Sequence, residues 1–113
     1  MSFDSQKLRY VFDIDGTICQ KTTSGYQNAI PYDDRIRKVN LLFEEGHHIT
    51  FFTSRGMHRN KGNVSACYSD YYELTKNQLV SWGVKFHVLI MGKPSADVFV
   101  DDVAESSEDY FEK

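Results

Sequence analysis

LRYVFDIDGT, at residues 8–17, is the stretch from which the fold of this 113-residue chain can be inferred. Residues 8–14 are mostly apolar, β-branched or aromatic, and they run into a second acid and a glycine. Such a run predicts a buried strand that opens into a turn. Asp13 and Asp15 therefore stand at the end of a buried strand, where open α/β sheets bind their ligands.

The rest of the sequence alternates predicted helices and strands. A polar loop or small hairpin is predicted at 17–31, followed by a helix from the acids at 33–34 to the glycine at 46 and a strand at 48–53. A loop at 54–69 leads to a second helix, from 69 or 70 to the glycine at 83. Strands at 84–90 and 97–100 and a short helix or tail from 104 complete the chain. This order predicts one domain, residues 1–113, of the α/β class. Its sheet would be mostly parallel, with about four strands and helices on both faces.

Composition and charge narrow the class of protein. The net charge is −3 and the Lys and Arg residues are scattered, so the sequence lacks the basic stripe typical of nucleic-acid binding. The first residues lack the pattern of a signal peptide, and no apolar run reaches the ~20 residues that span a bilayer, which predicts a cytoplasmic protein without a membrane partner. Cys19 and Cys67 match neither a zinc nor a redox pattern and are predicted to be free thiols.

Polar side chains stand at the ends of all four predicted strands. They are Asp13 and Asp15 after the first strand, Thr53, Ser54 and Arg55 after the second, Lys93 after the third, and Asp101 and Asp102 after the fourth. Because the carboxyl ends of parallel strands meet at one edge of a sheet, we expect these groups to converge.

This set of residues suits phosphoryl transfer. A phosphate dianion repels an anionic nucleophile unless a metal or cationic donors neutralise its charge. Mg²⁺ prefers carboxylate oxygens and would let several acids share one pocket. Asp13 could then attack phosphorus, while Asp15 protonates the leaving oxygen and later takes a proton from water. Thr53 and Lys93 would hold the phosphate oxygens, and Asp101 with or without Asp102 would complete the metal site.

The same residues resemble the motifs of a known family. FDIDGT at 12–17 is similar to the first motif of the haloacid dehalogenase (HAD) superfamily of phosphatases, FFTSR at 51–55 to the second, Lys93 to the third and VFVDD at 98–102 to the fourth. The resemblance implies a three-layer Rossmann-like (HAD-like) fold with strand order 4-1-2-3. It also implies Mg²⁺ held by Asp13, the carbonyl of Asp15 and an acid of the fourth motif. GKPSADVFVDD and SGYQNAIPYDDRI resemble small bacterial members associated with capsule and lipopolysaccharide sugar biosynthesis.

The chain departs from that family in having no room for a cap domain between its motifs. Substrate selection must then come from the loops at 18–30 and 54–68 or from a neighbouring subunit in a homo-oligomer. We expect a phosphomonoesterase acting on a small phosphorylated sugar or related metabolite. The alternatives are a phosphatase of nucleotides or nucleic-acid ends, which the missing basic stripe disfavours, and a catalytically idle regulatory or assembly module.

Several assignments stay open at this stage. Thr53 is preferred to Ser54 as the phosphate-binding hydroxyl because it ends the apolar run, and the sequence does not separate Asp101 from Asp102 as the direct metal ligand. Arg55 is a candidate for substrate contact or for a surface ion pair. Gly16 and Thr17, next to the two acids, are further candidates for substrate contact.

Overall fold

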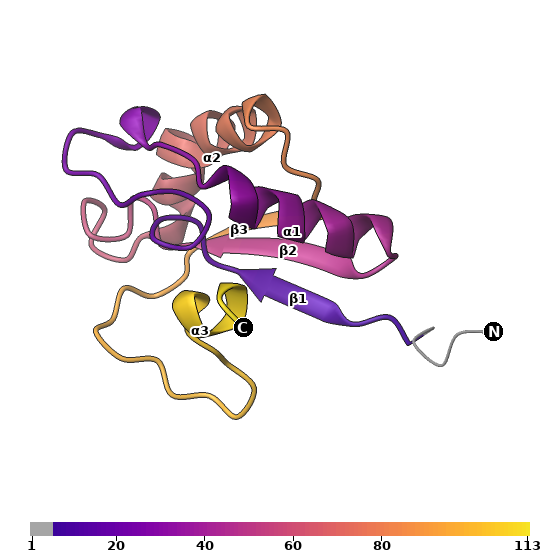
Figure 1. Cartoon of the computed structure of the whole chain (residues 1–113). Helices are drawn as coiled ribbons and strands as arrows, with labels where there is room; N and C mark the ends of the chain where they lie inside the picture. The colour runs from indigo at the N-terminus through magenta and orange to yellow at the C-terminus, as the bar shows by residue number, and fades with distance from the viewer. Residues whose placement is uncertain (1–5) are drawn as a thin grey trace.

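Three parallel strands form the centre of the molecule in the computed structural model, which describes residues 6–113 (Figure 1). The strands are β1 (Arg9–Phe12), β2 (His48–Thr53) and β3 (Val88–Met91), in the order β1-β2-β3. Phe12 lies opposite Phe51, and Phe51 lies opposite Leu89. This arrangement confirms the predicted α/β class and the parallel 1-2-3 part of the sheet. Residues 1–5, the first of those predicted to lack a signal-peptide pattern, lie outside the described residues.

Two helices cover the same face of this sheet. Helix α1 (Asp33–Glu44) contacts β2, and α2 (Val64–Ser81) contacts β3. Right-handed crossovers that step in one direction across a sheet place their helices on one face. The alternating positions on that face, among them Phe12, Phe51 and Leu89, form the buried core.

The other face of the sheet has no such cover within residues 6–113. Val11 on β1 is 64% exposed and Ile90 on β3 is 39% exposed. The prediction of helices on both faces is therefore wrong for the described part of the chain. The physical reason is that a helix on the second face requires a crossover to the far side of β1, and the chain makes no strand there.

Several element boundaries differ from the sequence prediction. Helix α2 begins at Val64, five or six residues earlier than expected, because the side chain of Asn63 accepts a hydrogen bond from the backbone N–H of Ala66 at 3.1 Å and caps the helix. Strand β3 begins at Val88 instead of residue 84. A short 3-10 turn, Tyr26–Asn28, lies in the predicted loop before α1.

The predicted fourth strand at 97–100 is not formed. Every residue of the segment 94–106, called the connecting segment below, is exposed, and Val98 and Val100 are 73% and 93% exposed. Apolar β-branched residues favour a strand only where a neighbouring strand pairs with it and a core packs against it. Neither is present here, so the prediction of four strands in the order 4-1-2-3 is wrong in this structure.

A short final helix, α3 (Ser107–Phe111), lies beside β1 on the side away from β2 (Figure 1). The Phe111 ring is buried and stacks on Phe12 with 5.8 Å between ring centroids, and Tyr110 meets Phe12 edge-on at 5.9 Å. The hydroxyl of Ser107 donates to the carbonyl of Gly16 at 3.2 Å. Helix α3 thus fixes the far end of the connecting segment close to the turn that follows β1.

Candidate active site

The end of β1 places Asp13 against Lys93. Lys93 Nζ lies 3.5 Å from Asp13 Oδ2, and the backbone N–H of Lys93 donates to the carbonyl of Thr53 at 3.0 Å, which holds the lysine next to the end of β2. Burial raises the pKa of Asp13 above its usual 3.8, and the charge of Asp15 adds to this, while Lys93 acts in the opposite direction. A carboxylate in this position gains from any further cation that binds beside it.

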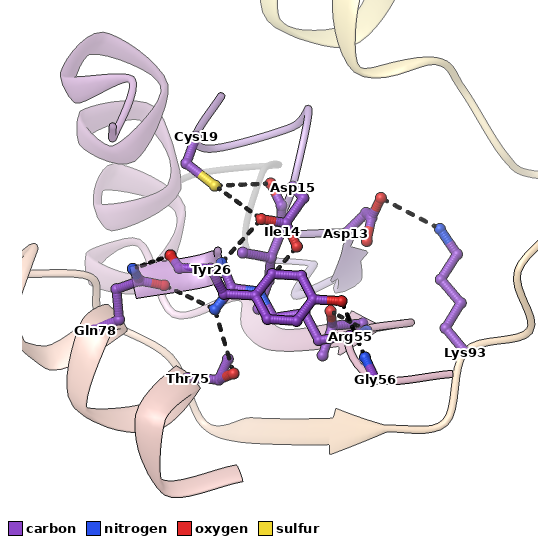
Figure 2. A network of polar contacts seen from close by, with 11 residues as sticks. Asp13, Ile14, Asp15, Cys19, Tyr26, Arg55, Gly56, Thr75, Gln78 and Lys93 are labelled. Atoms are coloured by element: carbon purple, nitrogen blue, oxygen red, sulfur yellow. Dashed lines mark hydrogen bonds and ion pairs between the residues drawn. The ribbon is translucent and has the colours of Figure 1, made fainter. Parts of the chain in front are cut away.

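The end of β2 places Arg55 against Asp15. The guanidinium forms a two-pronged ion pair, with Nε 2.8 Å from Asp15 Oδ2 and Nη2 2.9 Å from Oδ1 (Figure 2). Arg55 is only 1% exposed. The surface ion pair predicted as one alternative is therefore wrong, because the ion pair of Arg55 is buried. The other alternative, substrate contact, stays a prediction, and Arg55 lines the cavity described below.

The two predicted hydroxyls lie in different environments. Thr53 is buried, and its hydroxyl accepts a hydrogen bond from the backbone N–H of Arg55 at 3.1 Å, which turns the chain after β2. Ser54 lines the cavity described next. Ser54 therefore lines the cavity and Thr53 does not, while the choice of Thr53 as the phosphate-binding hydroxyl stays a prediction.

A cavity of about 330 Å³ opens at this edge of the sheet. Of the predicted site residues, it is lined by Asp13, Asp15, Ser54, Arg55 and Lys93, which confirms that the ends of the three observed strands converge. In open parallel sheets this edge is the usual position of a ligand site.

The cavity has further walls that were not singled out in the sequence. Lys21, Thr22 and Tyr26 line it from the loop before α1, and Phe99 lines it from the connecting segment. The Lys93 ammonium lies over the Phe99 ring, 4.7 Å from its centroid. The loop at 18–30 was expected to select substrate. Which of its side chains face the site depends on how the loop folds over the sheet, and the sequence does not show this.

The backbone carbonyls of Gly16 and Thr17 accept hydrogen bonds from other parts of the fold. The carbonyl of Gly16 accepts the Ser107 hydroxyl, and the carbonyl of Thr17 accepts a hydrogen bond from Arg35 Nη1 at 3.1 Å. Gly16 adopts φ 82°, a left-handed conformation that a glycine allows, and this lets the chain turn back after Asp15. Neither residue is among those that line the cavity.

The fit of the site to a magnesium ion depends on Asp13 and Asp15. Mg²⁺ is usually bound by one or two carboxylates together with waters and substrate phosphate, and these two acids offer that donor chemistry at one cavity. Among residues 6–113, however, no three His, Cys, Asp or Glu side chains come together in a way that could hold a metal ion. Asp101 and Asp102 are exposed on the connecting segment, so their predicted place in the metal site is not formed here. The cause is the absence of the strand that was to carry them.

Both cysteines are free, as predicted, and both are buried. The thiol of Cys19 lies 3.5 Å from Asp15 Oδ1 and 3.7 Å from the carbonyl of Ile14. Burial, with a smaller effect from the Asp15 charge, raises the pKa of Cys19 to about 12. Cys19 is therefore a protonated part of the wall behind Asp15 and is unsuited to act as a nucleophile.

Comparison with known proteins places this geometry in context. No protein-family model and no curated protein sequence matches the chain significantly. Among solved structures, a structural-genomics target from Vibrio cholerae superposes with a TM-score of 0.87 at 26% identity, over 96% of this chain and 89% of that one. A D,D-heptose 1,7-bisphosphate phosphatase from B. bronchiseptica, crystallised with magnesium and phosphate, superposes with a TM-score of 0.51 at 17% identity, over 88% of this chain and 54% of the phosphatase.

The chain shares its fold with a phosphatase. This supports the predicted Rossmann-like α/β fold. At 17% identity the likeness establishes the fold alone, and the chain spans about half the length of that phosphatase.

No helix within residues 6–113 is both long and apolar enough to cross a membrane.

Proposed function

We propose that this protein is a magnesium-dependent phosphomonoester hydrolase that works through an aspartyl-phosphate on Asp13. The observation that carries the proposal is the pairing of Asp13 with Lys93, at 3.5 Å, in an open cavity at the carboxyl ends of the strands. A nucleophilic carboxylate next to a cation is the minimum needed to bring a phosphate dianion within bonding distance of an anion.

The charges around the cavity suit a small anionic substrate. Lys93 reaches it from the end of β3 and Lys21 from the loop before α1, and Lys21 has no ion-pair partner among the residues that the structure describes. Ser54 adds a hydroxyl donor. These groups would bind the non-bridging oxygens of the phosphate, with Thr53 supporting the turn that presents Ser54.

The Asp13 carboxylate would hold Mg²⁺, together with the backbone carbonyl of Asp15 that the family resemblance implies, because the Asp15 carboxyl group is paired with Arg55 and is assigned the proton transfer. When bound, the ion supplies positive charge that offsets Asp13 and the phosphate oxygens. The raised pKa of Asp13 is consistent with a site that works with such a cation, because the isolated carboxylate is desolvated there.

The chemistry assigned to the chain has two steps. In the first, an Asp13 oxygen forms a bond to phosphorus as the bond from phosphorus to the ester oxygen breaks, and the departing oxygen takes a proton from Asp15. In the second, water attacks the same phosphorus and gives a proton to Asp15, and the bond between Asp13 and phosphorus breaks. Inorganic phosphate leaves, and both acids return to their initial state.

We propose a phosphorylated sugar or related small metabolite as the substrate, in the cytoplasm, with a role in capsule or polysaccharide biosynthesis. The described residues contain no cap domain over the site, so the loop with Lys21 and Tyr26 and the nearby Phe99 would contact the group that carries the phosphate. The scattered basic residues argue against nucleic-acid ends as substrates.

The test is hydrolysis of a panel of phosphate esters with and without Mg²⁺. The panel contains an aryl phosphate, several sugar phosphates, nucleotides and a 3′-phosphorylated oligonucleotide. We expect magnesium-dependent release of phosphate, greatest for a sugar phosphate, and a loss of roughly 10⁴-fold or more in Asp13→Asn. If the wild-type protein releases no phosphate from any ester, the idle-module alternative is correct.

A further inference from the structure

Arg55 is held in place from four sides. Besides its two bonds to Asp15, its Nη1 donates to Gln78 Oε1 at 2.7 Å and to Thr75 Oγ1 at 3.3 Å, both on α2 (Figure 2). The ring of Tyr26 lies against the guanidinium, 4.8 Å from its centroid. Four of its five N–H donors are paired and its side chain is fully buried, so Arg55 has little freedom to follow a substrate.

The surroundings of Arg55 are themselves tied together. Gln78 donates from Nε2 to the carbonyl of Tyr26 at 2.8 Å, so it joins α2 to the loop before α1. The backbone N–H of Gly56 donates to the Tyr26 hydroxyl at 3.1 Å, which joins that loop to the turn after β2. Every element that meets at Asp15 is therefore fixed through the same small network.

Asp15 has only one strong partner among these groups. The planar fork of an arginine fixes both the position and the plane of a carboxylate, because its two N–H bonds are parallel. The Asp15 side chain nevertheless keeps 23% of its surface exposed and lines the cavity. Each carboxylate oxygen has a second lone pair, so one of them can face a ligand while the fork stays intact.

We infer that Arg55 is a positioning residue, which orients Asp15 for proton exchange with the leaving oxygen and does not itself bind phosphate. This inference rests on the proposed function, because it concerns the proton transfer in that reaction. The proton moves between Asp15 and the ester oxygen, or between water and Asp15, and Arg55 neither gains nor loses one. Gln78 and Tyr26 act one step further away, by holding Arg55.

The test compares two substrates that differ only in their leaving group, phenyl phosphate and 4-nitrophenyl phosphate. The nitrophenolate departs readily without a proton, whereas the phenolate depends on one. General acid catalysis contributes about 10²–10⁴-fold, and kcat/KM reports the first step, in which the two leaving groups differ. Arg55→Lys should therefore lower kcat/KM for phenyl phosphate by roughly 10²-fold and for 4-nitrophenyl phosphate by less than about 10-fold. We expect KM for both substrates to stay within about 3-fold of wild type, since the phosphate contacts are intact. Asp15→Asn should show the same split between substrates, or a larger one.

A second variant covers the case in which Arg55→Lys does not fold. Gln78→Leu removes one anchor of Arg55 from a half-buried position, and it should give the same split with a loss of about 3- to 10-fold on phenyl phosphate. Asn40→Leu is the matched control. It breaks a comparable polar link, to the carbonyl of Gly83 and the N–H of Lys85, far along the chain from this network, and should leave the ratio of the two substrates unchanged.

The outcomes separate the hypotheses. A large rise in KM with unchanged kcat would make Arg55 a phosphate ligand, and equal losses on both substrates would make its role merely structural; either result overturns the inference while the proposed function stands. If Arg55→Lys does not fold and Gln78→Leu loses equal activity on the two substrates, the inference is likewise overturned. A wild-type protein that hydrolyses neither ester overturns the proposed function, and the inference falls with it.

Discussion

The turn after β2 and the connecting segment both carry residues that matched a motif, yet they differ in burial and in their contacts with the rest of the fold. At the turn, Arg55 is buried and its guanidinium is bound by Asp15, Gln78 and Thr75. Across the connecting segment, 94–106, every residue is exposed. A side chain is fixed where several elements contact it, and a favourable local sequence does not replace those contacts.

The largest difference between the two regions should be in stability. Phe51, fully buried at the centre of β2, packs near Phe12 and Phe86. Phe51→Ala should lower the free energy of unfolding by about 3–5 kcal/mol, because it removes a large apolar side chain and leaves a cavity. Urea denaturation followed by circular dichroism measures this.

Phe99 offers a matched control on the connecting segment. It is the same residue type but is 50% exposed. Phe99→Ala should cost less than about 1 kcal/mol, since half of its surface already meets water. Equal losses for the two phenylalanine variants would remove the proposed contrast between the regions.

An intermediate effect is expected where the connecting segment ends, at Tyr110 on α3. Burial, with smaller contributions from Tyr10 and nearby acids, raises the pKa of Tyr110 to about 12 from its usual 10. Between pH 10 and pH 12 the unfolded chain loses this proton while the folded chain keeps it. Folding stability should therefore fall as the pH rises through that window, by about 1 kcal/mol once the partial exposure of the ring is allowed for.

The comparison with Tyr110→Phe isolates this effect from the titration of lysines. The variant cannot lose a proton at this position, so its stability should fall less than that of the wild type between pH 10 and pH 12. Parallel pH curves for the two proteins would mean that α3 does not shield Tyr110 in solution, and that the far end of the segment is as loosely held as its middle.

Sequence patterns predicted the part of the fold that depends on local chemistry. The acids after β1, the hydroxyls after β2 and Lys93 after β3 were placed at one edge because parallel strands put them there, and the cavity confirms it for the three strands that form. The cap at Asn63 was missed because one polar residue after a glycine does not stand out in a polar stretch.

Long-range contacts explain what the sequence could not provide. The sequence left Arg55 as a candidate for substrate contact or for a surface ion pair, and only the meeting of α2 with the loop at Tyr26 buries it. Val98–Val100 has strand propensity, but propensity does not state whether a partner edge is available. The predicted place of Asp101 in the metal site depended on that pairing and failed with it.

The smallest expected effect gives the sharpest test of this difference. Val100 is 93% exposed, so Val100→Ser should change the free energy of unfolding by no more than about 0.5 kcal/mol, measured by urea denaturation without magnesium. The matched variant Ile49→Ser, in the buried part of β2, should be severely destabilised because it both removes apolar burial and buries a hydroxyl. A loss above about 1 kcal/mol at Val100 would show that the side chain packs in solution. The segment would then lie along the free edge of β1, and Asp101 would return as a candidate ligand beside Asp13.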